Sequence, residues 1–557
     1  MAQPGGALDA GENAAAPIAL SRHAGESRRL GRLRLAVTVV GVAPFAVAAA
    51  LEMARGWLPA SDDAVITFRA WATFSAHAPM LGQPTLVLPN GLSAHDLGPL
   101  EYWLLAVPVH LDPAQGALWG AALLCSVAIA LAVSAAWSVQ GWPAAAAVVA
   151  IVGIVIMERP AVVLDPVWNP NIGLVFFIAT AALGWAVAYG RFGYWPWLVL
   201  TASLAAQCHL MFALPAAACC VLCLALGLAS TRHWNWWVPL GLAVGIACWL
   251  APIVQEATGG SKGNVSLLLH MSGGGRALGL SFGLRALAAV VTPGPTWYHG
   301  GELDNFMWLL GTIGSRSSVL GGAVIALGAL GAVVCWMHGR RALATLWAVL
   351  VVLSVCVVFT LASYPVPSLA EVVALGYIDT VTWPIGLGLL AAACWSGFDL
   401  VRSSARRVRE RGDGVSKQAA WRPPVPALAL ALLALGALPV AWTVHDEGSS
   451  DLIISGWKSI ADVRTVVAKV RTEIRPGAIT VLQGYVGPGF ASLDEYGAVM
   501  GVLWGLYSSG YRPEAISFYA ALVRPEVSTL PSFSPGPPVP TVTVSYSGPV
   551  LVSLTGP

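Results

Sequence analysis

The sequence predicts an α-helical polytopic membrane protein with a small C-terminal α/β domain outside the membrane. The composition is the first reason, because 57% of the 557 residues are hydrophobic and only 10% are charged. The mean hydropathy of +0.71 is the second. The third is that apolar runs of roughly 17 to 25 residues, the length needed to cross a bilayer, recur from Leu35 to Thr443. A single soluble core cannot account for so many runs.

Basic residues mark the connections that we expect in the cytoplasm. Several arginines precede the first apolar run, and others stand at Arg191, Arg232 and Arg340 to Arg341. A further group lies between Arg402 and Arg422. By the positive-inside rule these connections are cytoplasmic, so the N-terminus is expected there too. The spans predicted in this way are, in order, Leu35 to Glu52, Ala117 to Trp137, Ala144 to Met157, Asn171 to Tyr189, Trp195 to Gln207, Leu210 to Ala229, Trp236 to Gln255, Val319 to Met337, Ala342 to Leu361, Thr382 to Phe398 and Val425 to Thr443.

One further apolar stretch, Leu97 to Leu111, is not counted as a span. It contains Pro99, Glu101 and Pro108. If it were a span, the acids that precede it in the chain and the acid that follows in a later connection would lie on opposite faces of the membrane. We therefore expect a re-entrant or interfacial helix there. About eleven spans remain.

The chain then divides into a cytoplasmic basic tail at 1–34, a transmembrane part at 35–443 and an extracytoplasmic α/β domain at 444–557. In the last segment, helical periodicity predicts helices over Ile460 to Ile474 and Leu493 to Ser508. Alternation predicts strands over Ala478 to Gln483 and Thr541 to Tyr546. We expect this domain to contribute to recognition of an acceptor and not to catalysis, because no cluster of acids, His or Cys occurs in it.

The candidate catalytic residues are acids in connections that parity places on the outer side. Asp62 and Asp63 directly follow the first span, and Asp165 lies in a later connection on the same side. An acidic pair at this position can also be a solvated loop or a helix N-cap. Further polar side chains gather on the same side, which favours a binding site. The candidate substrate-binding residues are His95, Asp96, Glu101, Arg159, Trp168, Asn169, Gln207, His209, Gln255, Lys262 and Asn264.

The order of these motifs resembles a family of actinobacterial membrane proteins that is similar in layout to the GT-C glycosyltransferases. The motifs are the Asp-Asp after the first span, His95-x-x-Gly-Pro-Leu-x-Tyr, Trp168-Asn-Pro, Gln207-x-His and a late Gly-Asn at Asn264. The GT-C superfamily includes protein O-mannosyltransferases, aminoarabinose transferases and arabinofuranosyltransferases. The likeness covers about Leu35 to His270. It departs from the expected pattern at His95-Asp96, where a His-Pro turn would be typical.

The resemblance implies transfer of a sugar from a polyprenyl-phosphate donor to a glycan, lipid or protein acceptor of the cell envelope. Asp62 or Asp63 stands where the superfamily has its first-loop acid, which implies a general base. Asp165 stands at the position of a second external acid. A cation would have to stabilise the phosphate leaving group. The candidates are Arg69, Arg159, Lys262, Arg276 and Arg285.

Two other functions remain open from the sequence. A transporter would carry ionisable residues near the middle of its spans, and these runs have almost none. A non-catalytic assembly protein of the cell envelope would use the C-terminal domain to bind partners. A divalent Mg²⁺ or Mn²⁺ on the Asp pair also stays open, although no dense carboxylate cluster is visible in the sequence. The formal net charge of +2 gives no indication of a nucleic-acid partner.

Overall fold

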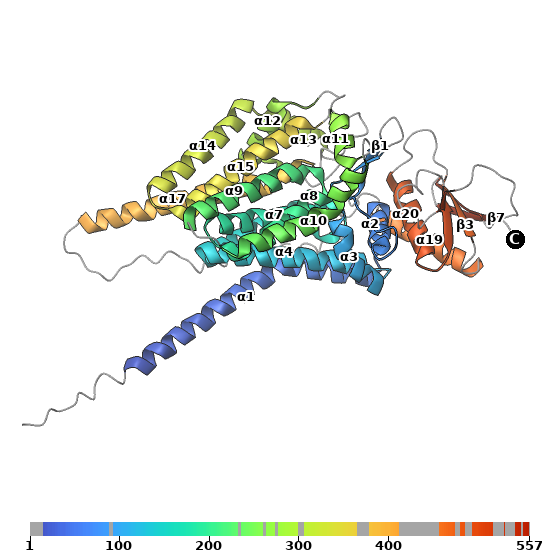
Figure 1. Ribbon diagram of the computed structural model, residues 1–557, viewed down its shortest axis with the longest axis horizontal. Coiled ribbons are helices and arrows are strands. Elements are labelled where there is room, and N and C mark those ends of the chain that lie inside the picture. The colour runs from blue at the N-terminus through green and yellow to red at the C-terminus, as the bar shows by residue number, and fades with distance from the viewer. Residues whose placement is uncertain are drawn as a thin grey trace, which may run out of the picture.

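A computed structural model describes most of the chain, and the helices in it form a long bundle with an α/β domain at one end (Figure 1). The described residues are 15–87, 93–231, 235–259, 263–272, 277–298, 306–364, 378–411, 456–473, 479–484, 493–515, 528–529, 541–546 and 550–555. The predicted span from Val425 to Thr443 and the candidate residues Lys262 and Arg276 lie outside them.

Eight helices in the described residues are long and apolar enough to cross a membrane. Each coincides with a run predicted from the sequence. These helices are α1 (Ala15–Arg55), α4 (Gly116–Gln140), α7 (Asn169–Ala188), α9 (Ala213–Thr231), α10 (Trp237–Gly259), α14 (Ser318–Met337), α15 (Arg341–Ser363) and α17 (Trp383–Arg411). Two other predicted spans form shorter helices, α5 (Trp142–Glu158) and α8 (Trp195–Cys208).

The remaining helices are short and connect or cover the long ones. They are α2 (Ser61–Ala72), α3 (Leu100–Leu111), α6 (Ala161–Leu164), η2 (Phe192–Tyr194), η3 (Leu210–Phe212), α11 (Asn264–Ser272), α12 (Leu280–Val291), η5 (Thr296–Tyr298), α13 (Phe306–Ser315) and η7 (Asp379–Thr382). The strands β1 (Pro84–Val87) and β2 (Ser93–His95) pair antiparallel in the connection before α3.

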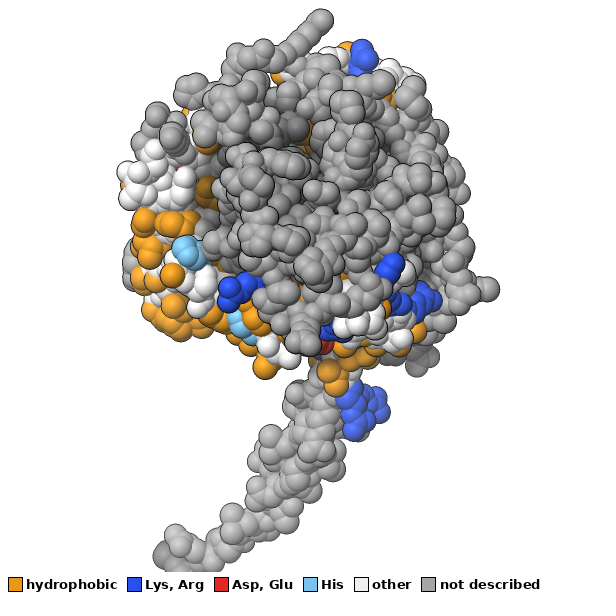
Figure 2. Space-filling model, turned by 90° about the vertical axis from the view of Figure 1, so that its right-hand side faces the viewer, with side chains coloured by type: hydrophobic (Ala, Val, Ile, Leu, Met, Phe, Trp, Pro, Cys, Tyr) orange, Lys and Arg blue, Asp and Glu red, His pale blue; other side chains and the backbone are white. Residues whose placement is uncertain are grey.

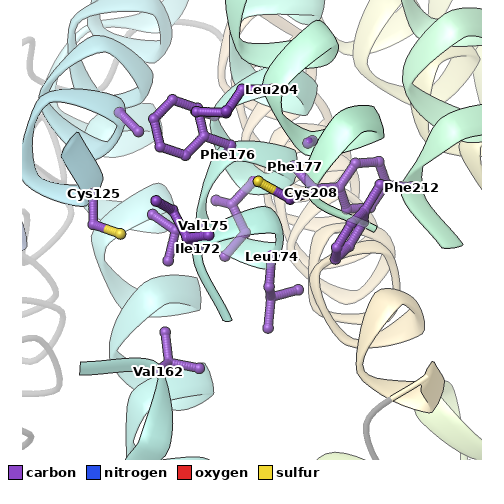
Figure 3. Packing of buried hydrophobic residues seen from close by; sticks show 14 of the residues in the cluster. Cys125, Val162, Ile172, Leu174, Val175, Phe176, Phe177, Leu204, Cys208 and Phe212 are labelled. Atoms are coloured by element: carbon purple, nitrogen blue, oxygen red, sulfur yellow. The ribbon is translucent and has the colours of Figure 1, made fainter. Parts of the chain in front are cut away.

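Helix α7 is the centre of the bundle, because nearly every one of its side chains is buried. Its apolar residues pack against α4, α8 and α9. Figure 3 shows Phe176, Phe177 and Phe212 filling this core, with the rings of Phe177 and Phe212 5.4 Å apart. Burying a Phe or Leu side chain contributes about 1.5–3 kcal/mol. In a membrane, however, packing and not exclusion from water favours one helix arrangement over another.

The two ends of the bundle differ in charge. At one end, which we call the basic end, Arg34 on α1 donates a hydrogen bond to Ser134 on α4, and Arg340 pairs with Asp399 at 2.8 Å. The other, which we call the acidic end, carries α2, α3 and the connection that contains Asp165. The alternating direction of successive long helices separates these two sets of residues, as the parity argument predicts.

Helix α3 does not cross the bundle, which confirms the prediction for Leu97 to Leu111. The backbone N–H of Leu100 donates to Gln207, which lies at the acidic end of α8. Just beyond the other end of α3, Gln115 donates to the carbonyl of Met53 near the end of α1. Both ends of α3 therefore lie at the acidic end.

The C-terminal part contains a five-stranded sheet with two helices. The strands are β3 (Ile479–Gly484), β4 (Arg512–Ala515), β5 (Ser528–Thr529), β6 (Thr541–Tyr546) and β7 (Val550–Thr555), in the order β5-β4-β3-β6-β7. All neighbouring pairs are parallel except β6 and β7. Helices α19 (Gly456–Glu473) and α20 (Leu493–Tyr507) pack on each other. The four predicted elements of this segment agree with α19, β3, α20 and β6.

Candidate active site

Helix α2 presents both candidate acids in its first turn. Asp62 and Asp63 follow Ser61, and carboxylates in this position are favoured by the positive end of the helix dipole. Asp62 also accepts a hydrogen bond from the indole Nε1 of Trp168 at 3.1 Å. This contact joins α2 to the start of α7, so the N-cap interpretation alone does not describe Asp62.

Asp63 and Asp165 form a hydrogen-bonded carboxyl pair. Burial raises the pKa of Asp63 well above its ordinary value, and the neighbouring charges of Asp165, Asp62 and Glu101 raise it further. Burial also raises the pKa of Asp165, although the hydrogen bond to Asp63 and the charge of Arg159 oppose this effect. Asp63 and Asp165 are half-buried, and two adjoining carboxyls with raised pKa values share a proton readily.

The connection between α6 and α7 holds Asp165 in place through its backbone. The Asn171 side chain donates to the carbonyls of Ala161 and Asp165 at 3.1 and 2.8 Å. Arg159 donates from Nε to the Asn171 oxygen at 3.2 Å, and its guanidinium lies 5.6 Å from the centre of the Trp168 ring. Arg159 is only 7% exposed. Its observed contacts organise the Asp165 connection, which differs from the phosphate contact considered above.

Asp96 joins three segments of the acidic end. Its Oδ2 accepts from Asn169 at 3.0 Å and its Oδ1 accepts from the Leu210 backbone at 3.2 Å. Asn169 donates as well to the carbonyl of Cys208 at 2.7 Å. Burial raises the pKa of Asp96 well above its ordinary value. Asp96 and Asn169 thus connect the loop before α3 to α7 and to the end of α8.

Gln207 and Glu101 lie beneath the loop before α3. Gln207 accepts from the Leu100 N–H at 3.3 Å and donates to the carbonyl of Cys248 at 2.8 Å. Gly98 allows this approach, because a Cβ there would lie 2.1 Å from the Gln207 oxygen. Glu101 is 4% exposed, and its Oε1 has no hydrogen-bond partner among the described atoms. Burial raises the pKa of Glu101 well above its ordinary value.

His95 is fixed by Asn264 through two reciprocal hydrogen bonds. The His95 N–H donates to the Asn264 side-chain oxygen at 2.8 Å, and the Asn264 amide donates to the His95 carbonyl at 2.9 Å. The N–H of Asn264 in turn donates to the Gln255 side chain at 3.2 Å. The Asn264 side chain thus pairs with both the N–H and the C=O of His95, as the backbone of a neighbouring β-strand would, and it joins α11 to β2.

A cavity of about 250 Å³ adjoins His95 at the far end of α2 from the acids. Burial lowers the pKa of His95, as does the nearby charge of Arg69, while a hydrogen bond to the carbonyl of Gly82 raises it. His95 is therefore mainly neutral at pH 7, and Arg69 supplies positive charge. The cavity is lined by Arg69, His77, Ala78, Pro79, Met80, Leu81, Gly82, His95 and Gln255.

The site expected from the sequence is thus divided into two regions. The acids Asp62, Asp63 and Asp165 meet beside Trp168, whereas His95 and Gln255 line the cavity without any of these three acids. This cavity adjoins His95 but none of the three acids, and the expectation that all four line a single cavity stays a prediction. Figure 2 views the molecule from the end that carries the C-terminal domain, and Arg and His side chains are visible there among the coloured atoms.

Sequence reasoning missed residues that hold the site together. Asn171 stands out in the sequence as an amide at the same helix entrance as Asn169, but it was not among the candidate binding residues, and its hydrogen bonds to the Asp165 connection were not expected. His77 was missed because it lies in an irregular segment where no periodicity marks its side. His209 was selected, and its Nδ1 accepts from the Met211 N–H at 3.3 Å, which caps η3.

The described residues contain no group of three or more His, Cys, Asp and Glu side chains arranged to hold a metal ion. The carboxyls that do meet are hydrogen-bonded to each other or to Trp168. Activity in excess chelator is the experiment that decides whether a divalent metal takes part.

Two comparisons return no relative: no protein-family model and no curated protein sequence matches this chain. Solved structures do match it in overall architecture. One is ArnT from Cupriavidus metallidurans bound to undecaprenyl phosphate, at 14% identity and a TM-score of 0.47 over 93% of each chain. Its apo state matches with a TM-score of 0.46, at 14% identity and over 94% of this chain and 93% of that one.

A second protein found is the oligosaccharyltransferase AglB from Archaeoglobus fulgidus, in complex with an inhibitory peptide and a dolichol-phosphate. It is 13% identical and matches over 92% of this chain and 69% of its own, with a TM-score of 0.38. Identities this low concern the fold alone. The chemistry therefore has to be argued from the side chains.

Proposed function

We propose that this chain is a membrane glycosyltransferase that moves a sugar from a polyprenyl-phosphate donor to a cell-envelope acceptor. The observation that carries the proposal is the distribution of charge along α2. The carboxyl pair of Asp63 and Asp165 lies at the start of this helix, and Arg69 lines a cavity at its far end. Asp63 and Arg69 are six residues apart, so they are separated by about 9 Å along the helix axis and by about 120° around it.

The two ends of α2 suit the two halves of a glycosyl transfer. The acceptor hydroxyl attacks the anomeric carbon, and its proton passes to the Asp63–Asp165 pair, which acts as the general base. A new bond forms between the acceptor oxygen and the anomeric carbon while the bond to the phosphate oxygen breaks. The electron pair leaves on the phosphate, whose negative charge is stabilised by Arg69 through charge-assisted hydrogen bonds.

The proposal places the acidic end on the extracytoplasmic side and the basic end in the cytoplasm. Arg34, Arg191 and Arg340 gather at the basic end, and the positive-inside rule favours the cytoplasm for such a group. The lipid tail of the donor would then lie between helices with its phosphate in the cavity. The C-terminal domain would be extracytoplasmic.

Transfer in membranes that contain the full-length protein tests this function. The probes are undecaprenyl phosphates that carry radiolabelled mannose, glucose or arabinose, supplied to membranes with and without the protein. We expect label from one donor to enter envelope material only when the protein is present, and not when Asp63→Asn replaces it. Transfer that is unchanged in both Asp63→Asn and Asp62→Asn contradicts the proposal.

The same experiment separates the alternative functions. A transporter would move the labelled lipid or sugar across sealed vesicles without forming a new linkage. An assembly protein would leave the label on the lipid but would lose its binding partners when the C-terminal domain is altered. The proposed enzyme forms a new glycosidic bond, which resists the mild acid that releases sugars from polyprenyl phosphate.

A further inference from the structure

The residue that leads into α2 has an unusual backbone conformation. Ser61 has a φ of 52° and is the one non-glycine residue with positive φ in the described part of the chain. Side chains other than glycine are strained in this left-handed region, so such a turn persists only where surrounding contacts hold it. Asp62 and Asp63 follow this turn directly, and its conformation sets where both acids point.

The C-terminal domain packs against this turn. Gly501 on α20 lies so close that a Cβ there would be 3.0 Å from the Pro59 carbonyl oxygen and 3.4 Å from the Ala60 Cα. Arg464 on α19 donates hydrogen bonds to the backbone carbonyls of Arg55, at 2.9 Å, and of Gly56. Contacts from two helices of the domain therefore fix the chain between the end of α1 and the start of α2.

The same domain also packs on the back of α2. Trp504 on α20 meets Phe68 edge to face with ring centres 4.9 Å apart, and it lies 5.9 Å from Trp71. At 3.6 residues per turn, Phe68 lies about 120–140° around α2 from the two acids, and Trp71 lies about 180° from Asp62. The Trp504 indole donates to the carbonyl of Pro113 at 3.0 Å, which ties this contact to the connection between α3 and α4.

Helix α2 is therefore held from both sides. Trp168 and Asp165 contact the acids on its front, and α20 contacts its back. We propose that the C-terminal α/β domain is a positioning element of the active site, which holds the Ser61 turn and α2 through Gly501 and Trp504 so that Asp62 and Asp63 meet Trp168 and Asp165. This inference rests on the proposed function for its consequence in catalysis, but the positioning itself can be measured without any substrate.

The C-terminal domain was expected from the sequence to recognise an acceptor, whereas the contacts on α2 give it a role in positioning the acids. A domain that only recognises an acceptor would alter the KM for that acceptor and leave the acids undisturbed. A positioning domain alters kcat and the protonation of the acid pair. Gly501 and Trp504 are positioning residues in this sense, since neither touches the reacting atoms.

A matched pair of glycines gives a direct test. Gly501 and Gly505 lie one turn apart on α20, and a Cβ at either would meet a valine of α19, at 2.6 Å from Val463 and 2.7 Å from Val467. Only the Cβ at Gly501 would also meet the α2 turn. Gly501→Ala and Gly505→Ala should therefore disturb the domain interior alike, and only Gly501→Ala should shift α2.

The readout is the infrared carboxyl C=O band of the full-length protein in lipid nanodiscs, titrated with pH. The band that disappears in Asp63→Asn belongs to the Asp63–Asp165 pair. The other ionisable groups around this pair are Asp62 on α2, Glu101 on α3, Arg159 after α5 and Glu52 on α1, and all of them stay in place in both glycine variants.

We expect the band of Gly501→Ala to titrate at least one pH unit below that of the wild type, because a displaced α2 opens the pair to water. Gly505→Ala should titrate like the wild type. Trp504→Ala should behave like Gly501→Ala, and Trp504→Phe, which keeps a ring against Phe68, should stay near the wild type. Circular dichroism and gel filtration identify any variant that fails to fold.

An unchanged titration in folded Gly501→Ala and Trp504→Ala overturns the proposal, and so does an equal shift in Gly501→Ala and Gly505→Ala. Where transfer is measured as well, we expect kcat to fall at least tenfold in Trp504→Ala with little change in the donor KM. A change confined to the acceptor KM assigns the domain to acceptor binding instead. If the band shifts as expected but Asp63→Asn still transfers sugar, the positioning holds and the proposed function fails.

Discussion

Asp63 and Asp165 come from different segments, the first turn of α2 and the link between α6 and α7, and their side chains are hydrogen-bonded to each other. The charge of Asp165 raises the pKa of Asp63, and burial raises the pKa of both carboxyls. The pair therefore holds a proton at a pH at which isolated aspartates have lost theirs. The proposed chemistry depends on this contact.

Replacing Asp63 with Asn should reduce kcat for sugar transfer by about 10²- to 10⁴-fold, the usual contribution of a general base. The amide keeps the size and the polarity of the side chain but does not accept the proton. The control is Asp399→Asn at the basic end, where the partly exposed pair with Arg340 contributes only about 0–1 kcal/mol. Equal activity in the two variants would show that Asp63 is not the base.

The transfer rate should rise with pH over a range above that of ordinary aspartates, since the pair must lose a proton before it can act. The raised pKa has the opposite effect on stability. Its stabilising contribution is complete below about pH 4, where the unfolded carboxyl titrates, and is lost as the pH rises through the raised pKa of the folded protein. Thermal unfolding measured from acid to neutral pH should therefore depend less on pH in Asp63→Asn than in the wild type.

Arg69→Gln should weaken binding of the donor more than it affects the acid pair. Arg69 lines the cavity together with His77 and the mainly neutral His95, so its loss removes a positive charge that a phosphate would meet. We expect the donor KM to rise at least tenfold and inhibition by free undecaprenyl phosphate to weaken, with Arg69→Lys intermediate. Arg191→Gln, at the basic end beside Tyr189, is the control; the same KM in both variants would exclude Arg69.

Asp96→Ala should destabilise the protein by about 1–3 kcal/mol, because the buried Asn169 amide and the Leu210 N–H would each lose an acceptor. The denaturation midpoint in detergent is the measurement. Asp399→Ala removes a carboxylate from a partly exposed site and should cost less than 1 kcal/mol. A stable Asp96→Ala variant that has lost activity would point instead to a direct role for Asp96 in the reaction.

Much of the fold could be predicted because hydropathy and charge act over whole segments. The long helices follow from apolar runs, and the position of α3 follows from parity together with the Pro and Glu residues of its segment. The grouping of Asp62, Asp63 and Asp165 at one end follows from the same argument. The division of roles within that group does not, because it depends on contacts between residues far apart in the sequence. Asp96, Asn169 and Gln207 were selected as binding residues, and the structure places them in hydrogen bonds between helices.

Other features leave no trace in a single sequence. The close approach of α20 to the Ser61 turn depends on the absence of a Cβ at Gly501, next to Pro59. A glycine inside an apolar helix can occur for many other reasons, so the sequence does not indicate this contact. The carboxyl pair raises a similar difficulty, since two acids separated by several helices look alike whether they meet or not.

The reciprocal hydrogen bonds between His95 and Asn264 join residues 169 positions apart in the chain. At a synthesis rate of about 5–20 residues per second, Asn264 is made about 10–30 s after His95. The contact of α20 with the Ser61 turn forms later still, since Gly501 lies 440 positions after Ser61. The acids are thus made before most of the bundle, and the contacts that hold their turn form only after α20 has been made. A nascent chain that has not yet reached α20 would already have the long helices of the bundle but would lack these contacts on the Ser61 turn.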